Sequence, residues 1–301
     1  ATALFREAGL DLDALRVAAR RADFHPVALP VTLSADIPVS ATTTVSHNVL
    51  AKLTGRTHPG EVVMFGAHWD AYGVGPPDAQ GRTIRAGAND DALGTAGILE
   101  LARVFAAGPR PARTLVFALW TAEERGLLGS MAYAENPLYP LPKTVANLTL
   151  DILQTAGPAR DVLLVGEGQS ELEDDLAHAA ARQGRVVTPE ALPERGLFFR
   201  ADHFPLAREG VPVLLLMAMS GGADLLDGGR EAGDRWLAGY MKCYHQACDR
   251  WSPDWDLRGA AQDVALLQAI GGQLANSRRW PQWRPGSEFR AVRQQSQSAR
   301  D

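Results

Sequence analysis

Short apolar runs rich in Val, Leu and Phe alternate along this chain with longer segments whose apolar residues recur at helical spacing. The short runs are predicted to be buried strands, and they cover residues 61–67, 113–120, 145–151, 161–165 and 211–217. The longer segments are predicted to be helices, and they cover residues 92–106, 172–182 and 260–274. Asp90 or Asp91 is placed to cap the first of these helices. Strands that alternate with helices are typical of βαβ units, so the pattern predicts an α/β sheet rather than a β-sandwich.

The two ends of the chain are less regular than its middle. Residues 12–22 are predicted to form a helix and residues 45–53 a strand, and no linker separates them from the following segments. Near the C-terminus Arg, Gln, Ser and Pro dominate, and the apolar period stops. We therefore expect one domain over residues 1–301, with an N-terminal segment, 1–47, packed on it and an irregular, wrapped or frayed tail over 278–301.

Composition excludes several classes of protein. With 301 residues, 46% of them apolar, the chain is long enough to remove roughly 75% of its unfolded surface from water, so disorder is excluded. The formal net charge is −5, which gives little of the positive field that a nucleic acid partner requires. The longest apolar run, 211–219, contains Pro212 and is far shorter than the roughly 20 residues of a membrane span.

Residues that can bind a metal follow three of the predicted strands. They are His68 and Asp70 after the first strand, Glu123 and Glu124 after the second, and Asp151 at the end of the third. In an open α/β sheet, ligands bind at the carboxyl ends of the strands. Each residue alone is more often a helix cap or a turn former. Together they supply the nitrogen and oxygen donors that suit zinc or another first-row divalent ion, and do not suit calcium.

Two further segments add the same chemistry. The glycine-bounded turn at 87–94 places Asp90 at the start of a predicted helix, and His245 lies in a polar segment near the C-terminal side. The adjacent carboxylates of Glu123 and Glu124 would repel one another unless a cation absorbs their charge. We therefore expect one of them to bind a metal and the other to transfer protons.

Two cysteines, Cys243 and Cys248, flank His245 in one short segment. A local disulfide would stiffen the loop that carries His245, whereas two reduced thiols are common in cytosolic proteins. A structural zinc site needs four ligands, and the chain has no second Cys or His pair to complete one. The residues alone leave the disulfide and the two free thiols as alternatives.

These motifs resemble those of the metallopeptidase family 28 enzymes, a group of di-zinc peptidases that includes secreted bacterial aminopeptidases. The family's metal motifs occur here in order, as His68-Trp69-Asp70, Asn89-Asp90-Asp91, Glu123-Glu124, Asp151 and His245. The resemblance implies a zinc-exopeptidase-like α/β fold, with a mixed, mostly parallel central sheet flanked by helices on both faces. Residues 1–47 resemble the segment that follows an inserted protease-associated domain in longer members, so the chain is expected to be the catalytic part of a longer precursor.

The resemblance also implies how two Zn²⁺ ions would be held. Asp90 would bridge the two ions. His68 and Asp151 would complete one site, and Glu124 and His245 would complete the other. Two such ions would hold a water molecule and lower its pKa, as hydrolysis at neutral pH requires.

Three further residues take catalytic roles in this scheme. Glu123 would be the general base, which takes a proton from the water and returns it to the leaving amine. Asp70, two residues after His68, would fix the tautomer of that imidazole ring. Tyr244, next to His245, would present its hydroxyl to the tetrahedral oxyanion.

The segment Phe199-Arg200-Ala201-Asp202-His203 matches the family's Arg-Ser-Asp-His stretch. Arg200 is expected to contact the substrate, with a surface salt bridge as the alternative. Asp202 and His203 are expected to support or pack near the site rather than bind metal.

The resemblance implies an aminopeptidase that acts on peptides with a free N-terminus, whose ammonium group the acidic site suits. A carboxypeptidase, a dipeptidase or a glutaminyl cyclase is the alternative on the same fold, and a basic pocket for a substrate carboxylate would favour the first two. A metal-free interaction module is the alternative of a different class. The cysteine pair resembles a short disulfide loop of some secreted relatives, which favours the periplasm or the extracellular space.

Overall fold

The computed structural model describes residues 1–32 and 34–300 and divides the chain into two compact units, Ala1–Val45 and Ser46–Asp301. Each unit is described by itself. The expectation that residues 1–47 pack on the rest of one domain stays a prediction. Residues 33 and 301, which fall within the two expected terminal segments, lie outside the described residues.

The first unit contains two short helices, α1 (Thr2–Glu7) and α2 (Leu12–Ala18). The Asp11 carboxylate caps α2, because it accepts hydrogen bonds from two backbone N–H groups of the first turn. α2 ends at Ala18, four residues before the end of the helix predicted over residues 12–22. Beyond its end the chain turns, and the Arg21 guanidinium pairs with the Asp23 carboxylate at 2.8 Å.

The second unit is built on a five-stranded sheet in the order β1-β5-β2-β6-β9. Its strands are β1 (Val49–Leu53), β2 (His58–His68), β5 (Arg113–Trp120), β6 (Thr144–Leu150) and β9 (Val213–Leu216). β1 is antiparallel to β5, and the other neighbours are parallel. The prediction of a mixed, mostly parallel sheet is therefore confirmed. Helices cover both faces of the parallel strands, and β5, β6 and β9 are therefore buried along almost their whole length.

Two small sheets lie beside the central one. β3 (Gly73–Val74) pairs with β4 (Ile84–Arg85) in an antiparallel hairpin, and β7 (Asp161–Leu164) pairs in parallel with β8 (Val186–Pro189). The prediction that residues 161–165 form a buried strand is right, but this strand does not join the central sheet. All four residues of β7 are buried, so its apolar sequence looks like that of a central strand. Only its pairing with β8 shows that it lies outside the central sheet.

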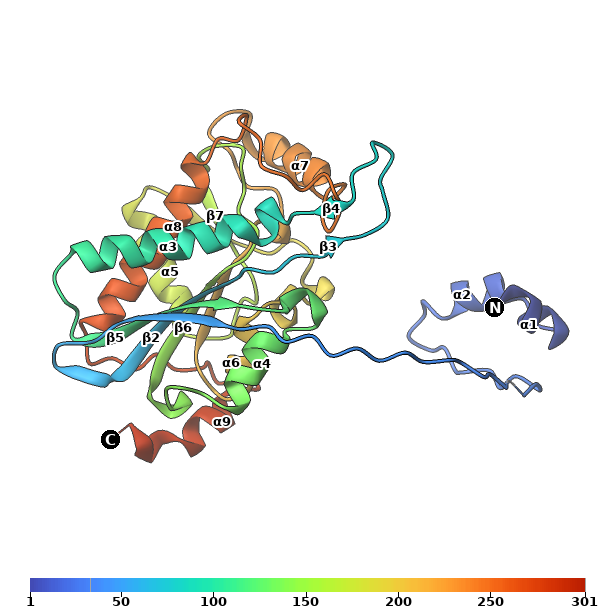
Figure 1. Cartoon of the computed structure of the whole chain (residues 1–301), viewed down its shortest axis with the longest axis horizontal. Coiled ribbons are helices and arrows are strands. Elements are labelled where there is room, and N and C mark those ends of the chain that lie inside the picture. Colours follow the sequence, from blue (N-terminus) through green and yellow to red (C-terminus); the bar gives the residue numbers. More distant parts are fainter. Residues whose placement is uncertain (33, 301) are drawn as a thin grey trace. The chain divides into compact units, whose positions relative to one another are not determined.

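Helices cover both faces of the central sheet. They are α3 (Leu93–Ala107), α4 (Leu128–Glu135), α5 (Leu172–Arg182), α6 (His203–Arg208) and α8 (Arg258–Ala275), and a further helix, α7 (Gly229–Tyr240), precedes the loop that carries His245. Figure 1 shows α3, α5 and α8 on one side of the sheet, and α4 and α6 on the other. Alternate side chains of β2 point to opposite faces of the sheet, so Val63 and Phe65 pack in one apolar cluster and Val62 and Met64 in another. Each such buried side chain contributes about 1.5–3 kcal/mol.

The C-terminal tail contains a helix that its sequence did not predict, α9 (Arg290–Gln295). Trp283 and Phe289 are buried, and the Trp283 indole N–H donates a hydrogen bond to the carbonyl oxygen of Gly210 at 2.8 Å. The buried Arg293 guanidinium of α9 donates to the carbonyl oxygen of Thr144 at 3.0 Å. These contacts come from isolated side chains without an apolar period, so periodicity did not reveal them.

Among the helices of the described residues, none combines the length and the apolar character that a bilayer span requires.

Candidate metal centre

Three neighbouring parallel strands bring polar residues to one edge of the central sheet. β2 ends at His68, the turn η2 (Glu123–Arg125) follows β5, and Asp151 follows β6 directly. β2 lies between β5 and β6, and all three strands run in the same direction. Their carboxyl ends therefore meet at one edge, which is where open α/β sheets bind their ligands.

Asp90 lies between two histidines at this edge. Its Oδ1 is 3.1 Å from Nε2 of His68, and its Oδ2 is 3.2 Å from Nε2 of His245. The same nitrogen of His245 is 3.1 Å from Oε2 of Glu124. Two clusters of potential ligand atoms result, His68 with Asp90 and Asp151, and Asp90 with Glu124 and His245. The structure thus brings together all five residues that the sequence assigned to metal binding, and Asp90 belongs to both clusters.

Two other carboxylates hold the turn that carries Asp90. This turn is η1 (Ala88–Ala92), in which the Asp90–Asp91 peptide bond is cis. Asp249 accepts hydrogen bonds from the backbone N–H groups of Asn89 and Asp90 at 3.0 and 3.1 Å. The N-cap of α3 is Ala92 and not Asp90 or Asp91, but Oδ1 of Asp91 accepts a hydrogen bond from the backbone N–H of Gly94 in the first turn, and Oδ2 accepts from the backbone N–H of His68. Sequence reasoning assigned no role to Asp249, and its place beside Cys248 was the only signal.

Residues with a positive φ angle surround the site. They include Ala122 (φ 54°), Ile152 (φ 51°) and His245 (φ 61°), none of which is glycine. Each of these conformations costs of order 1–3 kcal/mol and persists only where the surrounding structure imposes it. Two of the residues adjoin Glu123 and Asp151, and the third is itself a potential ligand. The fold therefore tolerates an energetic cost in the backbone that orients the side chains of the candidate site.

The loop that carries His245 is fixed by a disulfide and by aromatic contacts. Cys243 and Cys248 form the disulfide, with their Cα atoms 5.1 Å apart, so neither cysteine is free. The His245 ring contacts two tyrosines, with its centroid 4.4 Å from that of Tyr72 and 3.6 Å from that of Tyr244. Of the alternatives that the sequence left open for the cysteine pair, the disulfide is the one present.

Asp70 contacts both His68 and the glutamate turn. Nδ1 of His68 is 3.1 Å from the backbone oxygen of Asp70 and 3.7 Å from its carboxylate. The carboxylate accepts hydrogen bonds from the backbone N–H groups of Glu123 and Glu124 at 3.0 and 3.3 Å. When Nδ1–H donates to the nearer carbonyl oxygen, Nε2 faces Asp90, to which it donates a hydrogen bond when protonated, and its lone pair is available to a metal ion when it is not.

Burial makes several of these carboxylates hard to ionise. It raises the pKa of Asp151 well above its ordinary value and the pKa of Glu123 to about 9. At Asp90 burial acts in the same direction, but hydrogen bonds from His245 and His68 outweigh it and hold the pKa below its ordinary value. At His245 burial would lower the pKa, but hydrogen bonds to the neighbouring carboxylates raise it to about 9. So many acidic groups in one buried site call for a cation.

The donor set fits a first-row divalent metal ion. Oδ1 of Asp151 is buried, and among the described residues it has no hydrogen-bond partner. An acceptor buried in this way is costly unless another group satisfies it. Each cluster offers one imidazole nitrogen and carboxylate oxygens from two residues. That combination suits zinc, whereas calcium would take oxygen ligands alone.

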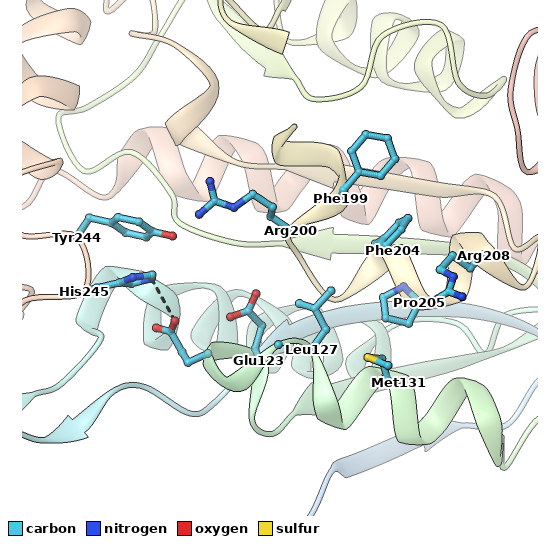
Figure 2. Close-up of a pocket in the computed structure, with 12 residues that line it drawn as sticks. Glu123, Leu127, Met131, Phe199, Arg200, Phe204, Pro205, Arg208, Tyr244 and His245 are labelled. Atoms are coloured by element: carbon cyan, nitrogen blue, oxygen red, sulfur yellow. Dashed lines mark ion pairs between the residues drawn. The ribbon is translucent and has the colours of Figure 1, made fainter. Parts of the chain in front are cut away.

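A cavity of about 410 Å³ opens beside the second cluster. The residues that line it are Glu123, Glu124, Gly126, Leu127, Met131, Phe199, Arg200, Phe204, Pro205, Arg208, Tyr244 and His245. Figure 2 shows the Tyr244 hydroxyl and the Arg200 guanidinium pointing toward one another at the end of the cavity nearest His245. Burial raises the pKa of Tyr244 far above its ordinary value, so the phenol keeps its proton at neutral pH.

Asp202 and His203 are both buried near the site, and neither belongs to the two clusters found among the described residues. Oδ1 of Asp202 accepts a hydrogen bond from the Ser130 hydroxyl at 2.5 Å. Burial lowers the pKa of His203 to about 3, so its ring is neutral at physiological pH. Asp202 is thus hydrogen-bonded to α4, and the His203 ring packs edge-on against the Phe198 ring with the two centroids 4.9 Å apart.

Comparisons with known proteins point to one family. The family model described as Peptidase family M28 matches residues 48–269. Leupeptin-inactivating enzyme 1 of Streptomyces exfoliatus is 31% identical over 209 residues, which are 67% of this chain and 43% of that protein. An aminopeptidase of Pseudomonas aeruginosa is 30% identical over 215 residues, 68% of this chain and 37% of its own length. A solved aminopeptidase structure from Aneurinibacillus sp. strain AM-1 matches with a TM-score of 0.53 and 25% identity, over 80% of this chain and 49% of that one.

This chain spans less than half the length of each of these relatives. The matched region contains the strands of the central sheet and every residue of the two clusters. Because the family model covers most of the chain, and the strand order and the clustered residues lie within the match, the chain belongs to peptidase family M28.

Proposed function

We propose that this protein is a zinc exopeptidase, specifically an aminopeptidase that removes N-terminal residues from peptides. The observation that carries the proposal is the pair of nitrogen and oxygen clusters that share Asp90. His68 and Asp151 would complete one zinc site, and Glu124 and His245 would complete the other. The name of the Pseudomonas aeruginosa relative supports the aminopeptidase assignment.

Bound zinc would polarise the scissile carbonyl group and lower the pKa of a water molecule. Cobalt and manganese accept the same donors, so the identity and the number of the ions need a direct measurement.

Glu123 is the proposed general base. Its Oε2 is 4.0 Å from Nε2 of His68, its side chain lines the cavity, and it belongs to neither cluster. In this role Glu123 takes the proton of the attacking water and returns it to the leaving amine. The Tyr244 hydroxyl donates a hydrogen bond to the oxyanion that develops on the substrate. Arg200 contacts the substrate from the same end of the cavity.

The acidic lining favours a substrate with a free amine. The carboxylates of Glu123 and Glu124 line the cavity, and that of Glu123 would pair with the ammonium group at the substrate's N-terminus. Leu127, Phe199 and Phe204 offer apolar surface in the same cavity for the substrate's side chain.

The disulfide between Cys243 and Cys248 indicates in which cellular compartment the protein works. Disulfides persist in oxidising compartments and are rare in the cytosol. We therefore place the protein in the periplasm or outside the cell.

The test combines elemental analysis of the purified protein with hydrolysis of aminoacyl amides and of N-blocked peptides, with and without a chelator. We expect two zinc ions per chain and chelator-sensitive hydrolysis of the substrates with a free amine. Cleavage only at free carboxyl ends would identify a carboxypeptidase instead. One zinc ion together with cyclisation of N-terminal glutamine would identify a glutaminyl cyclase, and a protein without metal would be a binding module.

The two adjacent glutamates provide a matched comparison. Glu123→Ala is expected to keep both metal ions and to lose turnover by a factor of about 10² or more, because it removes only the base. Glu124→Ala is expected to lower the metal content at one site, because it removes a ligand. Full activity of the first variant, or unchanged zinc in the second, contradicts the assigned roles.

A further inference from the structure

The cavity beside the metal centre has an apolar wall and a basic far end. Leu127 precedes α4 and Met131 lies within it, while Phe204 and Arg208 both belong to α6. Figure 2 shows Arg208 at the end of the cavity away from His245, beyond the apolar side chains. The cavity thus presents the carboxylates of Glu123 and Glu124 together with Arg200 where it meets the metal centre, and the Arg208 guanidinium where it ends.

Arg208 lacks the partner that would neutralise it. Among residues 1–32 and 34–300, neither Arg208 nor Arg200 makes an ion pair or a side-chain hydrogen bond. Arg208 is exposed, and it lies one helical turn after Phe204, whose ring lines the same cavity. A guanidinium group presents five N–H donors in a planar fork, so a carboxylate can bind it through two parallel hydrogen bonds.

We propose that Arg208 selects substrates that carry a carboxylate group at the far end of this cavity and disfavours substrates with a cation there. The inference rests on the proposed exopeptidase function. An apolar wall lowers the local dielectric constant, so attraction of a carboxylate and repulsion of an ammonium group are both stronger here than in open water. The carboxylate belongs either to an acidic side chain of the cleaved residue or to the free C-terminus of a short peptide.

The first experiment compares kcat/KM for N-terminal Glu and N-terminal Lys amides, using the metal-loaded protein. We expect Arg208→Glu to lower the Glu-to-Lys ratio at least about tenfold, because it reverses the charge that faces the substrate. Arg182→Glu is the matched control, since Arg182 is also exposed but ends α5 and does not line the cavity. Circular dichroism checks that both variants are folded, and Arg208→Gln should give an intermediate ratio.

The second experiment distinguishes the source of the carboxylate. Calorimetry measures the binding of Leu-Leu and of Leu-Leu-amide to the Glu123→Ala protein, with and without Arg208→Glu. If the protein binds Leu-Leu more tightly than Leu-Leu-amide and Arg208→Glu abolishes this preference, Arg208 binds the C-terminal carboxylate of the peptide. If Arg208→Glu changes only the hydrolysis of the Glu and Lys amides, Arg208 binds the acidic side chain of the cleaved residue.

Failure of the inference is distinct from failure of the proposed function. If the wild-type protein hydrolyses the amides, but neither the substrate ratio nor the binding preference responds to Arg208→Glu more than to Arg182→Glu, Arg208 has no role in selection. If no amide is hydrolysed while binding still depends on Arg208, the aminopeptidase assignment is wrong and the carboxylate site stands.

Discussion

A buried ion pair stabilises the end of β5 that lies farthest from the metal centre. The Arg113 guanidinium is fully buried, and its Nε donates to Oε2 of Glu61 at 2.6 Å, while 12% of the Glu61 side chain is exposed. Nη1 of Arg113 donates to the carbonyl oxygens of Leu274 and Arg279, both at 2.8 Å. One cation thus connects β2, β5, the end of α8 and the start of the tail. We predict that Glu61→Gln measurably destabilises this unit.

The expected loss follows from burial. Glu61→Gln keeps the shape of the side chain and removes its charge, which leaves Arg113 buried with only neutral acceptors. Breaking a buried pair costs about 3–5 kcal/mol. Water reaches part of Glu61, so we expect a loss of about 2 kcal/mol in the free energy of unfolding. For a domain of this size, the corresponding fall in Tm is about 5 °C.

A second glutamate provides the control, because it forms an equally short pair on the surface. Oε1 of Glu100 lies 2.6 Å from Nη2 of Arg103, but the two side chains are 49% and 67% exposed. Glu100→Gln is therefore expected to cost less than about 0.5 kcal/mol. Urea unfolding at pH 7.5, followed by circular dichroism, measures both variants. Equal losses would refute the reasoning from burial, since the N···O distance is the same in both pairs.

The same pair predicts a pH dependence. Burial alone would raise the pKa of Glu61, but Arg113 and Arg278 outweigh burial and hold the pKa below its usual value of 4.5. Stabilisation by a carboxylate with a lowered pKa is fully present above the pKa of the unfolded chain and is lost as the pH falls through the pKa of the folded protein. The stability gap between wild type and Glu61→Gln should therefore be constant above pH of about 5.5 and close at lower pH. A gap that persists in strong acid contradicts the assignment.

Adjacent glycines of α8 should respond oppositely to alanine. A Cβ at Gly271 would overlap the Phe65 ring, so Gly271→Ala is expected to cost about 2 kcal/mol. At Gly272 the nearest atom is 3.6 Å away, so Gly272→Ala should be neutral or should stabilise the protein by up to about 1 kcal/mol in thermal unfolding. Serine at both Cys243 and Cys248 should lower stability by about 2 kcal/mol, because it removes the constraint on the unfolded chain. Thiol titration of denatured, unreduced wild type should find no free cysteine, and two free thiols would contradict the disulfide.

The sequence alone determined the main strands, the helices α3, α5 and α8 and the chemistry of the candidate site, but not helices such as α4, α6, α7 and α9. The predicted strand 113–120 coincides with β5 (Arg113–Trp120), and the helix predicted at 92–106 is α3 to within one residue at each end. Apolar periodicity is a property of neighbouring residues, so it can be read without the fold. His68, Glu124 and Asp151 were found because they follow strands directly, and the carboxyl ends of parallel strands must meet. The roles of Asp90 and His245 came from the resemblance of their motifs to those of the family.

Only the tertiary structure decided which distant segments support these elements. Asp249 holds the turn at Asn89 across 160 residues of sequence, and β7 pairs with β8 rather than with the central sheet. The same holds for Arg208, which α6 brings to the cavity beside α4. Such contacts depend on how packed layers bring remote residues together. No local period encodes that arrangement, because its free energy arises only once the layers have assembled.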